Sequence, residues 1–286
     1  MKPIISLPHL LRIVPVFTFI LGFGVPVSAD PTPIVVCYPG GPVNESDANN
    51  AMGAMLRVVE RVGEWPSQSF SSRFTASLDE CRNLLDNQNP KFAITSLGLF
   101  LEQQKKHNLL PLVQPLMRGS ATETYRLIAK PGLYRDLEAL KGKRVGGTVF
   151  EERDFIRKIV FAGKIDPTVF FELKPSRQAI RAIRSLDKGE LDAVLVNGQQ
   201  YGALDSLNLP TSLDVIYTSK EIPLMGLVAD EKLTTPDERA RFAKALTGMC
   251  SDNEGKKLCE LFGVEAFRSA PDGTFHSMTS LWGQTK

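Results

Sequence analysis

The chain has 286 residues, 43% of them hydrophobic, which suffices for one large domain or two small ones with a proper core. Lys2 and Arg12 are the only charged residues before Asp30, so without them the 34 basic residues fall to 32 and equal the 32 acidic ones. This neutrality argues against nucleic acid as a partner, because proteins bind nucleic acid by neutralising phosphates with Lys and Arg.

The N-terminus has the plan of a secretory signal. After two basic residues, an apolar run extends from Ile13 to Val27 and ends in small residues at Ser28 and Ala29. We predict cleavage near Ala29, with export to the periplasm or the medium. The alternative is an uncleaved membrane anchor, which the shortness of the run and its two prolines disfavour.

The first part of the mature chain alternates strands and helices. We expect strands over 33–38, 68–75 and 91–96 and a short one over 110–113, because apolar runs there end at turn signals. A first helix opens at Ser46 or Asp47, a second is capped by Ser77 and Glu80, and a third runs to about His107.

A second alternating stretch follows, and then a mostly helical one. We expect strands over 125–129, 143–146, 168–173, 191–197 and 224–230. Helices are expected after Gly147, from Ser176, and after the capping box that Thr235 and Glu238 form, with Gly263 as a later helix stop.

The pattern predicts two α/β units of about a hundred residues each, with mostly parallel sheets and helices on both faces. Ligands of such sheets bind beyond the carboxyl ends of the strands. The residues at those ends are Tyr38, Ser96, the Gly147-Thr148 turn and Asn197.

Four cysteines, Cys37, Cys81, Cys250 and Cys259, permit two disulfides in three connectivities after export. Cys250 and Cys259 flank a short loop between two expected helices, and we predict that they pair. Cys37 and Cys81 could form the second bridge or could be buried thiols.

Three stretches together resemble a known family. They are SLDECRNLLDNQNPKFAITSLGLFL, KGKRVGGTVFEERDFIRK and SRQAIRAIRSLDKGELDAVLVNGQQYGAL. Their order is similar to that in type 2 periplasmic solute-binding proteins, and more narrowly to the phosphate/phosphonate-binding component of ABC transporters. The resemblance covers nearly all of the mature chain.

The resemblance implies a two-lobe Venus-flytrap fold that closes on a ligand by a hinge. The signal would be 1–29, lobe I would combine 30–120 with 222–286, and lobe II would be 121–221. Crossing strands are expected near 118–124 and 217–223. The implied protein is a monomer that delivers its ligand to an ABC permease in the inner membrane.

The resemblance further implies a small polar or anionic ligand of the phosphonate or phosphate type. Phosphonate binders of the family carry a Ser/Thr-rich turn at the start of the second-lobe helix, and here the turn from Gly146 to Glu151 keeps one hydroxyl, Thr148. Its glycines could face the ligand or could serve only the backbone angles of the turn. Glu151, Glu152 and Asp154 are interpreted as a solvated first helical turn.

We predict six ligand contacts, and most of them have a structural alternative. Tyr38 could instead pack on the first helix, Ser96 could cap the next helix, and Asn197 could form a polar turn. Beside Thr122, Glu123 could meet an amine but is more simply explained as a surface partner of Arg126. The predicted contacts are Tyr38, Gly40, Ser96, Thr122, Thr148 and Asn197.

Catalytic signals are scarce, so we predict a binding protein and no enzyme. The three histidines lack metal-ligand spacing, and neither a nucleophile elbow nor a dinucleotide fingerprint is present, so no metal or cofactor is expected. Two alternatives stay open: a transporter-independent sensor or partner-binding module of the same fold, and a secreted enzyme on a bilobal scaffold.

Overall fold

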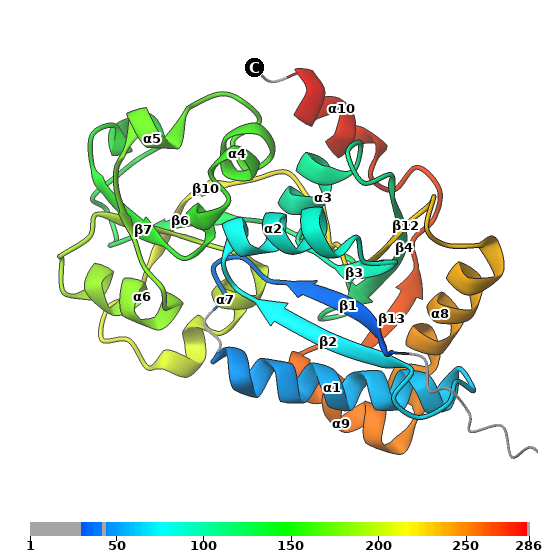
Figure 1. Cartoon of the computed structure of the whole chain (residues 1–286). Coiled ribbons are helices and arrows are strands. Elements are labelled where there is room, and N and C mark those ends of the chain that lie inside the picture. The colour runs from blue at the N-terminus through cyan, green and yellow to red at the C-terminus, as the bar shows by residue number, and fades with distance from the viewer. Residues whose placement is uncertain (1–29, 42–43, 285–286) are drawn as a thin grey trace, which may run out of the picture. The chain divides into compact units, whose positions relative to one another are not determined.

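A computed structural model describes residues 30–41 and 44–284. The predicted signal peptide, 1–29, lies outside the described residues. The described part of the chain folds around two mixed sheets that form two lobes, as Figure 1 shows. We call the elements around the first sheet lobe I and those around the second sheet lobe II.

The sheet of lobe I has the order β13-β4-β12-β3-β1-β2. β1 pairs in parallel with β2 and β3, as predicted for this segment. β12 runs antiparallel between β3 and β4, and β13 pairs antiparallel with β4. The strands are β1 (Thr32–Cys37), β2 (Phe70–Thr75), β3 (Phe92–Ile94), β4 (Leu109–Leu116), β12 (Leu227–Asp230) and β13 (Ala266–Ser269).

Helices cover both faces of this sheet because successive side chains of a strand point to opposite faces. Ile34 and Val36 of β1 pack in one core, together with α1 (Glu45–Val62), α8 (Pro236–Gly248) and α9 (Asn253–Phe262). Val35 and Cys37 pack in the other core, together with α2 (Leu78–Gln88) and α3 (Leu97–Gln103). Figure 1 shows α1 and α2 on opposite sides of β1 and β2.

The sheet of lobe II has the order β10-β6-β9-β7-β8. β7 pairs in parallel with β8 and β9, while β6 and β10 are antiparallel additions. The strands are β6 (Arg126–Ala129), β7 (Arg144–Gly147), β8 (Glu172–Pro175), β9 (Ala193–Val196) and β10 (Asp214–Thr218).

Short helices surround this second sheet. α6 (Ala179–Asp187) packs on Ile128, Val194 and Val196 of one face. The other elements are η1 (Glu138–Leu140), η2 (Val149–Glu151), α4 (Arg153–Phe155), η3 (Ile156–Val160), α5 (Pro167–Phe170), α7 (Gly198–Gly202) and η4 (Leu204–Leu207).

Two strands connect the sheets where the sequence predicts crossings. The chain leaves β4, passes through β5 (Thr122–Glu123) and enters β6. It returns from β10 through β11 (Ile222–Pro223) to β12. β5 and β11 pair antiparallel, so the two connections lie side by side.

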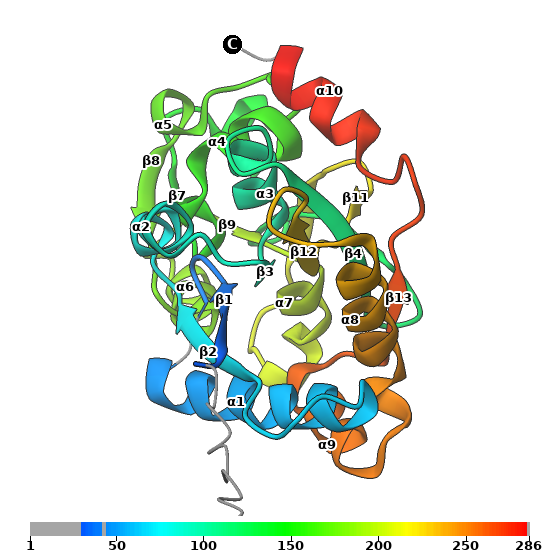
Figure 2. The same cartoon turned by 45° about the vertical axis from the view of Figure 1, so that its right-hand side comes forward.

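The C-terminal helix α10 (His276–Gln284) lies over parts of both lobes (Figure 2). Just before it, Phe275 packs against Phe100 of α3, with ring centroids 5.7 Å apart. Within α10, the Trp282 ring lies under Lys158 of η3, and the Lys158 ammonium nitrogen is 4.9 Å from the ring centroid. After α8 the chain forms η5 (Met249–Ser251), which leads into α9.

Local signals place most helix ends. Ser77 caps α2, Thr235 and Glu238 form a capping box with Pro236 in the first turn of α8, and Gly263 ends α9 in the left-handed region at φ 66°. α1 begins at Glu45, one residue before the predicted start, because the Asn44 side chain accepts a hydrogen bond from the Ser46 amide.

The starts of two predicted elements in lobe II are wrong. The segment 168–173 is not one strand, because Asp166 caps α5 and Pro167 occupies its first turn, which delays β8 to Glu172. The helix from Ser176 begins only at Ala179, since the Ser176 hydroxyl bonds to Gln178 in a local turn.

All four cysteines form disulfides. Cys250 pairs with Cys259, as predicted, and Cys37 pairs with Cys81, with Cα atoms 5.8 and 5.7 Å apart. The second bridge joins the end of β1 to α2. None of the helices in the described ranges combines the length and apolar character that crossing a membrane requires.

The two disulfides should differ in their contribution to stability. In the chain-entropy account the bridge with a sequence separation of 44 contributes about 4 kcal/mol and the one with a separation of 9 about 2.6 kcal/mol. We expect the Cys37→Ala/Cys81→Ala variant to unfold at lower urea concentration than the Cys250→Ala/Cys259→Ala variant. Equal midpoints, or the reverse order, would contradict this account.

Candidate functional site

In each lobe a polar residue shortly follows a buried strand and caps the next helix. The Ser96 hydroxyl after β3 accepts a hydrogen bond from the Leu99 amide at 3.1 Å. The Asn197 side-chain oxygen after β9 accepts one from the Gln200 backbone amide at 2.9 Å. The Gln200 side-chain oxygen in turn accepts one from the Asn197 backbone amide. The capping alternative therefore holds for Ser96, and it leaves the Ser96 hydroxyl hydrogen free to donate. Asn197, for which a polar turn was the predicted alternative, is also a helix cap.

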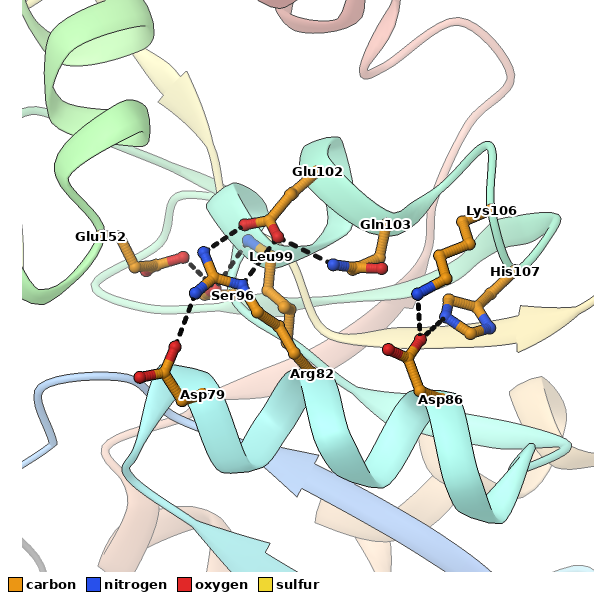
Figure 3. Close-up of polar contacts among 10 residues, drawn as sticks. All are labelled: Asp79, Arg82, Asp86, Ser96, Leu99, Glu102, Gln103, Lys106, His107 and Glu152. Atoms are coloured by element: carbon orange, nitrogen blue, oxygen red, sulfur yellow. Dashed lines mark hydrogen bonds and ion pairs between the residues drawn. The ribbon is translucent and has the colours of Figure 1, made fainter.

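Ser96 uses that hydrogen to contact lobe II. Its hydroxyl donates to Oε1 of Glu152 at 2.6 Å, as Figure 3 shows. Glu152 lies between η2 and α4, where the predicted continuous helix is broken into a 3-10 turn, one α turn and a π segment. Glu151 and Asp154 are exposed, as expected for a solvated turn, but for Glu152 that interpretation is wrong.

The carboxyl of Glu152 has an unusual environment. Burial is the main cause that raises its pKa to about 7, against the lowering effect of hydrogen bonds from Ser96 and the Leu99 amide. Glu102 raises the pKa further and Arg82 lowers it. Arg82 is already held by Glu102 at 2.7 Å and by Asp79 at 2.8 Å (Figure 3), and no ion pair to Glu152 is found within 30–41 and 44–284.

Thr148 lies beside this contact and connects to the capping box of α7. It is 5% exposed, and its hydroxyl accepts a hydrogen bond from the Gln200 side-chain amide at 2.9 Å. The backbone of Gly40 in lobe I lies directly against the Thr148 carbonyl. At φ 70° and with no space for a Cβ, this position requires glycine.

The glycines of the turn before Thr148 serve the sheet. Gly147 has φ 147°, and a Cβ there would lie 2.5 Å from the Leu195 carbonyl oxygen of β9. The sequence allowed these glycines either to face a ligand or to serve the backbone angles of the turn. Backbone geometry accounts for Gly147.

A second carboxylate, Glu123, lies at the crossing between the lobes. Its Oε2 accepts a hydrogen bond from the Gly198 amide at 3.0 Å, so it faces the start of α7. Burial raises the pKa of Glu123, and bonds from Gly198 and the Tyr125 hydroxyl oppose that rise. The predicted surface pair with Arg126 is wrong, because the Arg126 guanidinium lies 4.3 Å from the Tyr201 ring centroid.

Glu123 and Glu152 both raise the pKa of two nearby tyrosines. Tyr38 is 42% exposed, yet burial is the largest cause that raises the pKa of its phenol, followed by Glu123 and Glu152. Burial and the same carboxylates also raise the pKa of Tyr125, which is 9% exposed and meets Phe155 edge to face at 5.6 Å. The end of β1 and the crossing strand therefore share one acidic environment.

The six predicted contacts are distributed unequally. Ser96 and Gly40 of lobe I touch lobe II, while Thr148 and Asn197 are joined through Gln200. Thr122 instead makes local contacts, with Ser120 at 3.0 Å and with Pro223 across β5 and β11. None of the six lines either of two surface hollows, of about 400 Å³ beside Cys250 and about 440 Å³ beside Arg153.

The sequence analysis missed Glu152, Glu123 and Gln200 as members of this site. The spacing of Asn197 and Gln200 is that of a capping box and could have identified Gln200. Glu123 and Glu152 gave no local signal, since tertiary contacts alone place them. Among the described residues, no three His, Cys, Asp or Glu side chains gather as a metal site requires.

Solved structures share this fold at low sequence identity. A binding-protein component of an ABC phosphonate transporter from Pseudomonas aeruginosa matches with a TM-score of 0.67 at 15% identity, over 88% of this chain and 86% of that one. A Xanthomonas citri protein bound to ATP matches with a TM-score of 0.67 at 10% identity, over 88% and 96%.

A Prochlorococcus marinus protein in complex with methylphosphonate matches with a TM-score of 0.65 at 11% identity, over 88% of this chain and 97% of that one. These likenesses establish the type 2 periplasmic-binding-protein fold. No curated protein sequence matches the chain.

A family model decides the assignment. It describes the periplasmic substrate-binding protein of phosphonate ABC transporters and matches residues 43–275, which is most of the chain. Members of this family are binding components of transporters and not catalysts. The chain therefore belongs to the family of periplasmic substrate-binding proteins of phosphonate ABC transporters.

Proposed function

We propose that the chain is an exported solute-binding protein that captures a small polar or anionic molecule, of the phosphonate or phosphate type, between its lobes. After cleavage near Ala29 it would work as a monomer and deliver the closed complex to an ABC permease. The family assignment supports the class of function, and the two-lobe fold with its paired crossings supports hinge closure.

The observation that carries the proposal is the meeting of polar groups from both lobes. Ser96 from lobe I meets Glu152 from lobe II, and Gly40 meets Thr148 beside the Gln200 amide. In a two-lobe binding protein, a ligand contacted by both lobes stabilises the closed arrangement over the open one. We propose Tyr38, Gly40, Ser96, Thr122, Thr148 and Asn197 as its contacts, with Gln200 added.

The proposed boundaries between the lobes lie at the two chain crossings, near β5 and β11. Lobe I would comprise 30–120 and 222–286, and lobe II would comprise 121–221, with β5 and β11 as the hinge. The pairing of these two strands supports a hinge there because a short two-stranded segment joins the sheets.

The chemistry of the site favours a ligand that accepts hydrogen bonds. Ser96, Thr148 and Gln200 supply hydroxyl and amide donors to such a ligand. Glu123 and Glu152 share the same environment, so a fully charged anion would be bound only where these carboxyls are protonated or displaced. Among related folds, the Prochlorococcus marinus protein holds methylphosphonate, which is our first probe.

Thermal shift of the mature protein, from Asp30 onward, tests the proposed function. The panel contains methylphosphonate, other phosphonates, phosphate, sulfonates, carboxylates and amino acids. A ligand at a hundredfold its dissociation constant stabilises the folded state by about 2.7 kcal/mol, which for a chain of this size raises the melting temperature by about 5 to 10 °C. A panel without any shift would contradict capture of these solutes.

Thr148→Val tests the site at nearly constant side-chain volume. Losing the hydroxyl removes one polar contact, so we expect about tenfold weaker binding of the best panel ligand. Isothermal titration measures this, with Thr168→Val as the control because Thr168 is an exposed residue of α5. Equal losses in both variants, or none in Thr148→Val, would place the ligand elsewhere.

A further inference from the structure

The contact of Glu152 with Ser96 joins elements that are far apart in the sequence and belong to different lobes. The carboxylate comes from the break between η2 and α4 in lobe II, and the hydroxyl comes from the start of α3 in lobe I. A 2.6 Å distance from a hydroxyl to a carboxyl oxygen is in the range of strong hydrogen bonds.

Lobe I has a matching seat for this side chain at Gly98. A Cβ at Gly98 would overlap Oε1 of Glu152 and would lie 2.8 Å from the Cβ of Phe155. Phe155 is 4% exposed and follows Glu152 in α4. The absence of a side chain at Gly98 therefore lets both lobe II residues approach the backbone of α3.

The charged groups around this seat come from several elements. Arg82 of α2 and Glu102 of α3 form an ion pair nearby, Tyr38 follows β1, and Tyr125 and Glu123 lie at the crossing. Arg82 is shared with Glu102 and Asp79, so the negative charge of Glu152 is left without full compensation. Closing the lobes therefore buries a carboxyl whose charged form is disfavoured.

We propose that Glu152 is an interlobe latch: it binds Ser96 in the ligand-free protein, holds the lobes together, and has to leave before a ligand uses the same donors. This inference rests on the proposed function only in assuming that the lobes open and close. It differs from ligand capture because the chain supplies the occupant of its own site.

The latch is sensitive to pH in a defined direction. In the closed form the pKa of Glu152 is about 7, while in the open form the side chain reaches water and returns toward its ordinary value near 4.5. The closed form thus binds a proton more tightly, so closure is favoured at low pH and weakens as pH rises toward and past 7.

Distance measurement between the lobes tests the latch without any ligand. All four native cysteines are in disulfides, so Lys105→Cys in lobe I and Val169→Cys in lobe II, both at exposed positions, accept spin labels selectively. We expect Glu152→Ala to shift the distance distribution to longer values at pH 5.5 and at pH 8.5. The protein with Glu152 unchanged should be closed at pH 5.5 and open at pH 8.5. The Glu152→Gln variant should stay closed at both pH values.

Two further variants keep the test decisive. Gly98→Ala retains the carboxyl but fills its seat, so it should open the protein as Glu152→Ala does. Glu151→Gln makes the same charge change at the neighbouring exposed residue and should behave like the unmodified chain. If neither Glu152→Ala nor Gly98→Ala changes the distances, the latch is refuted. A flat thermal-shift panel with opening in both variants would instead refute the proposed ligand and leave the latch standing.

Stability against pH gives an independent measurement of the same group. Because the folded-state pKa of Glu152 lies above its unfolded value, the folded chain binds more protons between about pH 4.5 and 7. The free energy of unfolding contributed by this group therefore falls as pH rises through that window. Urea titrations at several pH values should show a smaller fall for Glu152→Gln than for Glu151→Gln. Identical pH profiles would overturn the assignment of this proton to Glu152.

Discussion

The structure depends on how the polar groups between the two lobes are satisfied. Hydroxyl and amide groups at the ends of β3 and β9 must find partners when they leave water, since an unpaired buried polar group costs more than a hydrogen bond returns. Ser96 bonds to Glu152, and the Gly198 amide bonds to Glu123. Each partner is a carboxyl group from another part of the chain, and burial disfavours the charged form of each. The contacts between the lobes are therefore made by carboxyl groups whose charged forms would gain from hydration.

Much of the fold could be predicted because its signals are local. Capping residues and apolar periodicity located α1, α2 and α8, and the sequence placed Ser96 and Asn197 within two residues of the ends of β3 and β9. Both residues proved to be helix caps, and Ser96 also faces the other lobe. A cap and a binding group can coincide because a hydroxyl both accepts and donates.

The features that the sequence did not predict depend mainly on contacts between distant segments. Glu152 resembles its exposed neighbours in the sequence, and only the break of the helix after η2 turns it toward α3. Glu123 similarly depends on α7, which lies far along the chain. Asp166 and Pro167 changed a predicted strand into α5, which shows a capping pair outweighing the β-preference of the following residues.

The Cys37–Cys81 bond makes the site depend on the chemistry of the compartment in which the chain folds. Cys37 immediately precedes Tyr38, and Cys81 immediately precedes Arg82, so the bond ties together two of the groups that surround Glu152. A reducing cytosol would leave that tie unmade, and the strand end would be held by packing and backbone bonds alone. Material prepared from the cytosol and from an oxidising compartment would then differ at the candidate site itself, even where both samples are soluble and compact.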